Sequence, residues 1–161
     1  MAYAAVDIQM LRGVEGEYII KEFGLYDARL DMNRTVVFGP PCAESMLLPN
    51  ILRENYYVTY NFHGLRWNCG SEPYHYLQDT LRTVTCPYMT LYVKGRQKKT
   101  LLQSFLNIHI VDVEEMGCPK LDKLPQLPVR AHCVEHTMFP LHSCAAVNAK
   151  RVGLWYEFNK A

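Results

Sequence analysis

The segment from Cys133 to Cys144 reads CVEHTMFPLHSC and brings thiols and imidazoles close together in the chain. Zinc takes about four tetrahedral ligands from thiolate, imidazole and carboxylate groups, often including a close pair on one turn. Cys133 and His136 have that spacing, and His142 and Cys144 add donors further along. Alternatively, each is a separate structural residue, because single cysteines and histidines usually pack or hydrogen bond. Their clustering favours a metal site.

A second segment, VKGRQKKT, concentrates positive charge around a glycine. Its cations are Lys94, Arg96, Lys98 and Lys99. The end of a parallel strand followed by the start of a helix can offer backbone N–H groups and positive charge to a phosphate. These residues are therefore candidates for binding a nucleic-acid backbone. The alternative is a solvated basic helix start.

The segment 56–67 is rich in aromatic residues. They are Tyr56, Tyr57, Tyr60, Phe62 and Trp67. Such side chains can stack on single-stranded bases or form a protein interface, and some are expected in the core. Both binding interpretations remain open.

The elements that position these groups follow from hydrophobic periodicity and turn residues. Predicted strands span 2–14, 18–30 and 35–41, with DMNR as a turn before the third. Segment 42–71 is expected to be irregular with short helical turns. Further on, helices at 72–85, 96–108 and 143–159 alternate with strands at 88–95 and 109–116. A strand, helix and strand in succession predict a parallel pair with a crossover helix.

The resulting order, β-β-β-α-β-α-β-α, predicts an α/β fold with a mixed sheet flanked by helices. The layout resembles a ribonuclease H-like domain and, within that class, the DnaQ-type exonucleases. The chain has 161 residues, 49% of them hydrophobic and 20% charged. That length suits one core and is short for two ordinary domains, so we expect a single domain over 1–161.

The sequence YIIKEFGLY, together with Cys-x-x-His and the later Cys-Ala, resembles the Maelstrom domain of germline small-RNA pathways. The resemblance implies a structural Zn²⁺ bound by Glu22, Cys133, His136 and Cys144. It also implies a role in small-RNA (piRNA) or transposon silencing. The chain departs from the family in being shorter, and His142 competes for the fourth ligand position.

Strand alternation gives a separate view of Glu22. It places Tyr18, Ile20, Glu22 and Gly24 on one face of the second strand, so Glu22 can point inward with Ile20. A buried carboxylate is unfavourable unless it is paired or bound to metal. An edge-strand glutamate facing water is the alternative.

An active DnaQ-type exonuclease holds two magnesium ions with four carboxylates, starting from Asp-x-Glu on the first strand. Here that strand carries Asp7 and Gln9, and a neutral glutamine cannot supply the second anion. Asn148 stands near an expected aspartate on the final helix, whereas Asp112 keeps one acid. We therefore expect a degenerate site without two-metal hydrolysis.

Charge and composition limit the partners and location. The formal net charge of +1 predicts no global field for polyanions, so a nucleic-acid contact requires a local patch. The first residues have no basic region followed by an apolar core, and no stretch approaches the roughly 18 apolar residues of a membrane span. We expect reduced cysteines in an intracellular protein, cytoplasmic or nuclear, without a membrane partner.

Together these features predict a catalytically degenerate, zinc-stabilised exonuclease-like domain that binds single-stranded nucleic acid, RNA more than DNA. Two alternatives remain. One is a protein-interaction module on the same scaffold, with 56–67 as its interface. The other is an active nuclease.

Overall fold

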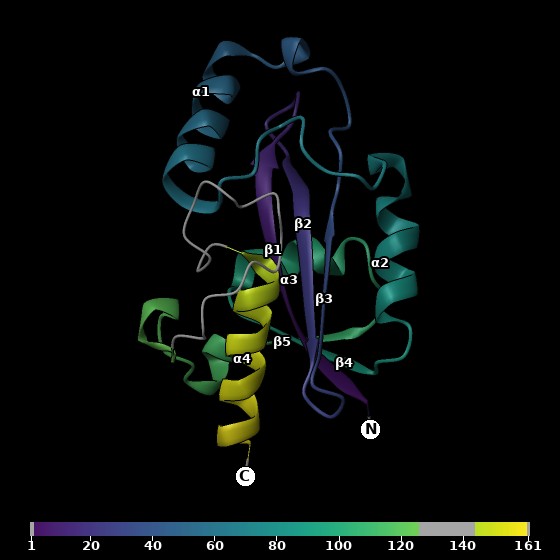
Figure 1. Ribbon diagram of the computed structural model, residues 1–161, viewed down its shortest axis with the longest axis vertical. Coiled ribbons are helices and arrows are strands. Elements are labelled where there is room, and N and C mark those ends of the chain that lie inside the picture. The colour runs from purple at the N-terminus through teal and green to yellow at the C-terminus, as the bar shows by residue number, and fades with distance from the viewer. Residues whose placement is uncertain (1, 126–143, 161) are drawn as a thin grey trace.

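The computed structural model describes residues 2–125 and 144–160 and contains a five-stranded mixed sheet flanked by helices (Figure 1). Neighbouring strands follow the order β3-β2-β1-β4-β5. The α/β class and the succession of antiparallel and then parallel strands are therefore confirmed.

The strands are β1 (Tyr3–Arg12), β2 (Tyr18–Asp27), β3 (Met32–Val37), β4 (Thr90–Val93) and β5 (His109–Asp112). The first three pair antiparallel, whereas β4 pairs parallel with both β1 and β5. The turn predicted at DMNR lies earlier, because β3 already begins at Met32 and Asp31 takes a positive φ of 46°. The strand predicted over 109–116 ends at Asp112, which caps a 3₁₀ turn over Val113–Met116.

The helices are α1 (Pro49–Val58), α2 (Leu77–Thr85), α3 (Arg96–Gln103) and α4 (Ala145–Asn159). The last three correspond to predicted helices. The first was not predicted as a full helix, since its segment was expected to be irregular. Pro49 suits the first turn of α1, and Asn55 holds the helix to the end of β1 through two hydrogen bonds with the Arg12 backbone.

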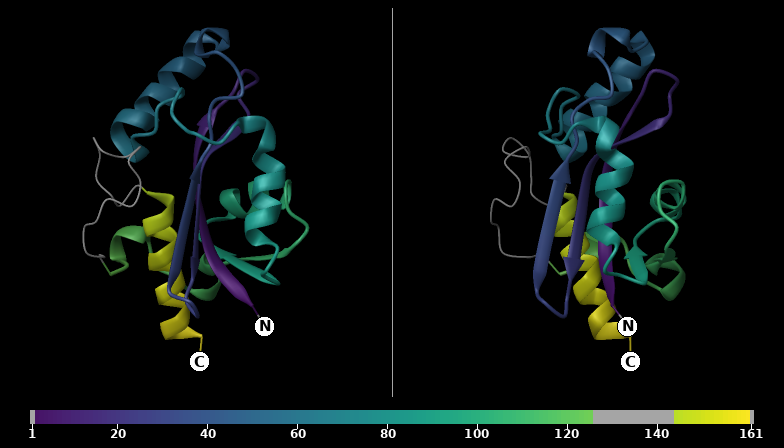
Figure 2. Two further views of the ribbon diagram at one scale, coloured as in Figure 1. Left: turned by 45° about the vertical axis from the view of Figure 1, so that its right-hand side comes forward. Right: turned by 90° about the vertical axis from the view of Figure 1, so that its right-hand side faces the viewer.

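Opposite faces of the sheet are covered by different helices. In Figure 2, α2 and α4 lie on opposite sides of β1 and β2. Leu81 of α2 and Leu102 of α3 share a core with Val6 and Ile8, whereas Val152 of α4 packs with Ala5. Alternate strand residues point to opposite faces of the sheet. Among β1 residues 5–8, the even-numbered positions therefore face α2 and α3, and the odd-numbered positions face α4.

A bulge in β2 reverses the alternation that the sequence predicted. Gln9 pairs with Glu22 and Met10 pairs with Ile20, so Lys21 is the extra residue on β2. Ile20 joins the core under α2 and α3, whereas Glu22 faces α4. The predicted placement of Ile20 and Glu22 on one face is therefore wrong, although the inward burial predicted for Glu22 is correct.

The bulge also buries Lys21, which has no exposed surface. Its ammonium group donates hydrogen bonds to the carbonyl oxygens of Phe38, Trp67 and Cys69 at 2.6, 2.9 and 2.7 Å. A buried charge is tolerated only with such compensation. Lys21 therefore ties β2 to the end of β3 and to the loop that follows α1.

Candidate functional site

The strongest side-chain constellation surrounds Asp7 on the central strand β1. Lys98 Nζ lies 2.6 Å from Asp7 Oδ1, and Asn148 Nδ2 donates to Asp7 Oδ2 at 3.1 Å. The structure thus brings together two members of the predicted degenerate site, Asp7 and Asn148, and adds a lysine that we had assigned to phosphate binding.

The short length of β4 explains how Lys98 reaches Asp7. Of the β1 residues, β4 pairs only with Tyr3, Ala4 and Ala5, so Asp7 lies just beyond the carboxyl end of β4. α3 begins at Arg96, shortly after β4 ends at Val93, and packs on the face opposite α4, and Lys98 in its first turn contacts Asp7. In parallel α/β units this is the edge where ligands commonly bind.

Asp7 is almost completely buried, with 4% of its surface exposed. Burial raises the pKa of its carboxyl group, whereas the Lys98 charge and the hydrogen bonds from Lys98 and Asn148 act in the opposite direction. The pKa of Asp7 stays raised overall, so the ion pair with Lys98 compensates only part of the effect of burial on the carboxylate.

The remaining acidic positions do not complete a two-metal site. Gln9 is neutral and lies opposite Glu22 in the sheet register. Asp112 Oδ1 accepts hydrogen bonds from the backbone N–H groups of Gly95 and Glu114 at 2.9 and 3.0 Å. Asp112 therefore caps local backbone. Within residues 2–125 and 144–160, these positions do not supply the four carboxylates of a two-magnesium centre.

Asn148 has one polar atom without a partner. Its Nδ2 contacts Asp7, but its buried Oδ1 has no hydrogen-bond partner among the residues that the structure describes. Asn148 itself is 3% exposed. An unpaired buried amide oxygen is unusual in a folded protein and marks a position where a cation or a donor would be accommodated.

Two of the four predicted zinc ligands meet where α4 begins. Cys144 Sγ lies 3.7 Å from Glu22 Oε2, and the Ala145 backbone N–H donates to Glu22 Oε1 at 2.7 Å. Thr35 Oγ1 contacts Glu22 Oε2 at 3.5 Å. The acid and the thiol are both fully buried. Such a pair fits half of a tetrahedral zinc site.

The other predicted ligands, Cys133, His136 and His142, lie outside the described residues. Within 2–125 and 144–160, no group of three or more His, Cys, Asp or Glu side chains is arranged to hold a metal ion. The zinc site therefore stays a prediction that rests on the meeting of Glu22 and Cys144.

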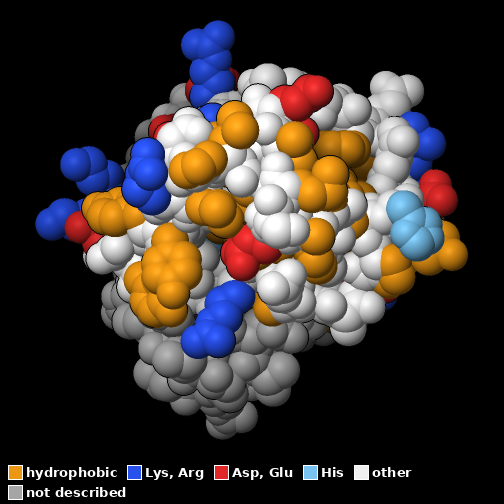
Figure 3. All heavy atoms as spheres, turned by 90° about the horizontal axis from the view of Figure 1, so that it is seen from above, with side chains coloured by type: hydrophobic (Ala, Val, Ile, Leu, Met, Phe, Trp, Pro, Cys, Tyr) orange, Lys and Arg blue, Asp and Glu red, His pale blue; other side chains and the backbone are white. Residues whose placement is uncertain are grey.

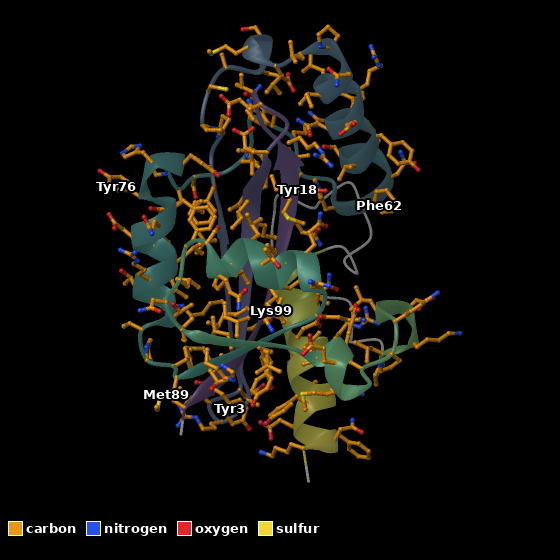
Figure 4. The ribbon with its side chains drawn as sticks, turned by 180° about the vertical axis from the view of Figure 1, so that it is seen from behind. Tyr3, Tyr18, Phe62, Tyr76, Met89 and Lys99 are labelled. Carbon is orange, nitrogen blue, oxygen red and sulfur yellow. The ribbon has the colours of Figure 1, made fainter. Side chains whose placement is uncertain are left out.

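The predicted basic patch is partly used by the fold. Lys94 forms an ion pair with Glu114 at 3.0 Å, and Lys98 pairs with Asp7. Backbone N–H groups at this helix start were expected to be available to a phosphate, but that of Gly95 donates to Asp112 Oδ1. Arg96 remains exposed, and Lys99 lies on α3 as seen from behind in Figure 4.

The aromatic segment forms a face on α1 and on the π-helical turn Thr59–His63 that follows it. We call it the α1 aromatic face and define it by four side chains, each between 45% and 62% exposed: Tyr56, Tyr57, Tyr60 and Phe62. Hydrophobic side chains gather at this end of the molecule, with basic side chains beside them (Figure 3). Trp67 is different, because it is buried and donates its indole N–H to Cys42 O.

The rings of this face are organised in pairs. Tyr56 and Tyr60 have centroids 4.5 Å apart, and Tyr57 meets Phe62 edge to face at 5.8 Å. Tyr56 and Tyr60 line two pockets, one of which includes Arg53 and the other Arg66. The sequence identified these aromatic residues but gave no signal that the two arginines would flank them.

The chain was also compared with known proteins. No protein-family model and no curated protein matches it. Among the helices in the described part of the chain, none is long and apolar enough to cross a membrane.

Proposed function

We propose that this chain is a catalytically degenerate, ribonuclease H-like domain that binds single-stranded nucleic acid without hydrolysing it. The observation that carries the binding role is the exposed Tyr56 and Tyr60 pair, flanked by Arg53 and Arg66. Proteins that bind single strands combine aromatic side chains for stacking with cations for the backbone.

The strand order and the position of Asp7 support a relationship to DnaQ-type exonucleases. A central β1 that carries an acid just beyond the end of a parallel neighbour is the layout expected for that class. The loss of hydrolysis follows from the residues present. Gln9 and Asn148 are neutral, and the one buried acid on β1 is paired with Lys98.

A structural zinc ion belongs to the same proposal. Glu22, Cys133, His136 and Cys144 would hold it, with His142 as the alternative fourth ligand. Bound there, the metal would join β2 to the start of α4, where Glu22 already accepts the Ala145 N–H. Its contribution would be to folding free energy, since structural zinc sites stabilise the native state directly.

RNA is the preferred ligand in this proposal, in keeping with the Maelstrom resemblance and its small-RNA setting. Discrimination between RNA and DNA requires contact with the ribose 2′-hydroxyl, in addition to stacking. Exposed polar groups beside the aromatic rings, including Asn61 and Asn68, line the same two pockets.

Protein binding by the same face is the second candidate. Glu44 lines the pocket that contains Arg66, so the charges there are mixed. Tyrosines are also enriched in protein interfaces, where they contribute contact area together with a hydroxyl group. A protein partner would not require the steep salt dependence that phosphate contacts produce.

Fluorescence anisotropy with labelled, mixed-sequence single-stranded RNA and DNA tests the proposal. The double variant Tyr56→Ala/Tyr60→Ala should lose about 1–3 kcal/mol of binding free energy for each lost stack. Tyr76→Ala is the control, because Tyr76 is also exposed but lies far from Phe62 (Figure 4). Affinity should fall steeply with salt. No binding by wild type, or equal loss in both variants, would reject the proposal.

A further inference from the structure

The ammonium group of Lys98 lies beside the buried carboxyl group of Asp7, where a positive charge is favourable. The ammonium nitrogen lies 2.6 Å from Asp7 Oδ1, at the carboxyl end of β4. The Lys98 side chain is only 24% exposed, so this contact is not a loose surface pair. Lys98 comes from α3, Asp7 from β1 and Asn148 from α4, so the cluster joins three separate elements.

We propose that the Lys98 ammonium group takes the place of a divalent cation at Asp7, and that its removal opens a metal site formed by Asp7 and Asn148. This inference does not depend on nucleic-acid binding. It predicts that the wild-type chain has no divalent-cation site at Asp7, because the charge needed there is already part of the protein.

Charge compensation is the first argument. The Asp7 carboxylate is buried in the sheet, and an unpaired carboxylate in such a place is strongly disfavoured. Without Lys98, Asp7 must take up a proton or another cation. Asn148 cannot replace the lost charge, because its amide is neutral.

Ligand chemistry is the second argument. Hard divalent cations prefer carboxylate and amide oxygens, and magnesium often uses one or two protein carboxylates together with water. Asp7 Oδ1 would be released by loss of Lys98. Asn148 Oδ1 is buried, has no partner among the described residues and belongs to the amide that already contacts Asp7. The two oxygen ligands would therefore belong to side chains that are already in contact.

The position of Lys98 in α3 is the third argument. Lys98 lies in the first turn of α3, while Lys99 beside it forms no ion pair with any residue in the described ranges. The two neighbouring lysines therefore differ in role, although the sequence assigned both to phosphate binding. This difference provides a matched control.

The test is Mn²⁺ binding, measured by electron paramagnetic resonance on zinc-replete protein at neutral pH. Lys98→Met keeps most of the side-chain length and removes the charge. We expect it to bind Mn²⁺ at least about tenfold more tightly than wild type, with oxygen ligands of the kind that Mn²⁺ accepts. Lys99→Met should behave as wild type, and Asp7→Asn/Lys98→Met should lose the gained binding.

Equal Mn²⁺ binding by Lys98→Met and wild type, both folded by circular dichroism, would overturn the proposal. So would gained binding that persists in Asp7→Asn/Lys98→Met. If Lys98→Met does not fold alone, its folding on addition of Mn²⁺ supports the proposal, and failure to fold with Mn²⁺ opposes it. A measurement on wild type remains informative in every case: Mn²⁺ must not broaden the amide resonance of Ile8, and broadening there would contradict the proposal.

Discussion

Glu22 Oε2 on β2 lies 3.7 Å from Cys144 Sγ at the start of α4, although the two residues are 122 positions apart in the chain. The contact is buried on both sides. It brings together the acid and the last thiol of the predicted zinc ligands.

A zinc ion bound at this contact should be lost when any one of its predicted ligands is replaced by a residue that cannot bind the metal. Purified wild-type protein should contain about one equivalent of zinc by elemental analysis. Glu22→Gln, Cys133→Ala and Cys144→Ala should each contain far less and melt at lower temperature, because structural zinc adds to folding free energy. Cys86→Ala should retain the metal, because Cys86 is exposed. A stable wild type without zinc would remove this part of the proposal.

Because β2 packs closely against α4, we expect Gly24→Ala to lower the free energy of unfolding strongly. A Cβ atom at Gly24 would lie 2.3 Å from the Ala145 carbonyl carbon, and this neighbour is backbone. The new methyl group should therefore separate α4 from β2 and lower the free energy of unfolding by about 1–3 kcal/mol or more.

Gly39→Ala is the matched control for that variant in urea denaturation. A Cβ atom there meets its nearest neighbour, the Gly70 carbonyl oxygen, at 3.6 Å, which is ordinary contact. Equal loss of stability in the two variants would show that the approach of α4 to Gly24 is not the cause. If zinc content is reduced in Gly24→Ala but not in Gly39→Ala, zinc binding depends on the position of α4.

Lys21→Met should be among the most destabilising single changes in the sheet. The carbonyl oxygens of Phe38, Trp67 and Cys69 would lose their shared donor, and each buried group left unsatisfied is unfavourable by about 1–3 kcal/mol. Lys123→Met, at an exposed position, should change the free energy of unfolding by less than about 0.5 kcal/mol. A similarly small change for Lys21→Met would show that the three contacts contribute little.

The carboxyl group of Asp27 should make the stability of the fold depend on pH. Burial alone would raise the pKa of its carboxyl group, but the hydrogen bond from Tyr88, with the bonds and charge of Arg29, lowers that pKa overall. A carboxyl group whose pKa is lower in the folded state stabilises the fold above its unfolded pKa. This stability is lost as pH falls through the folded pKa.

Tyr88→Phe tests that linkage, because it removes the 2.9 Å hydrogen bond and keeps the ring. The variant should lose about 1.5–3 kcal/mol of stability at pH 7. The difference from wild type should shrink as pH falls below about 4 and through the lowered pKa of Asp27 in the folded wild type, because protonated Asp27 no longer accepts a hydrogen bond as a carboxylate. A difference that is constant from pH 7 to pH 3 would argue for a packing effect.

The sequence predicted the sheet well because its signals are local. Alternating apolar residues and polar turns identify β1 and β2, and the strand, helix and strand around α3 imply parallel pairing. α1 escaped detection because aromatic and asparagine residues crowd its second half, and both types favour helices weakly. Its helical form depends on contacts such as those of Asn55 with the Arg12 backbone.

The candidate site was less predictable because its decisive contacts are not local. Nothing in VKGRQKKT distinguishes Lys98, which turns toward Asp7, from Lys99. The bulge at Lys21 depends on the register between β1 and β2, which hydrophobic alternation alone does not specify. One signal was available: a lysine between isoleucine and glutamate in a buried strand needs a partner, and Lys21 has three carbonyl oxygens.

Binding without hydrolysis is tested by measuring both properties of the wild-type protein in one sample. End-labelled single-stranded RNA is incubated with wild-type protein and Mg²⁺ or Mn²⁺, then resolved on native and denaturing gels. We predict that binding retards the RNA on the native gel and that the RNA on the denaturing gel remains full length, because it is not cleaved. Cleavage by wild type that disappears in Asp7→Ala would contradict it, because Asp7 would then serve hydrolysis and not the ion pair with Lys98.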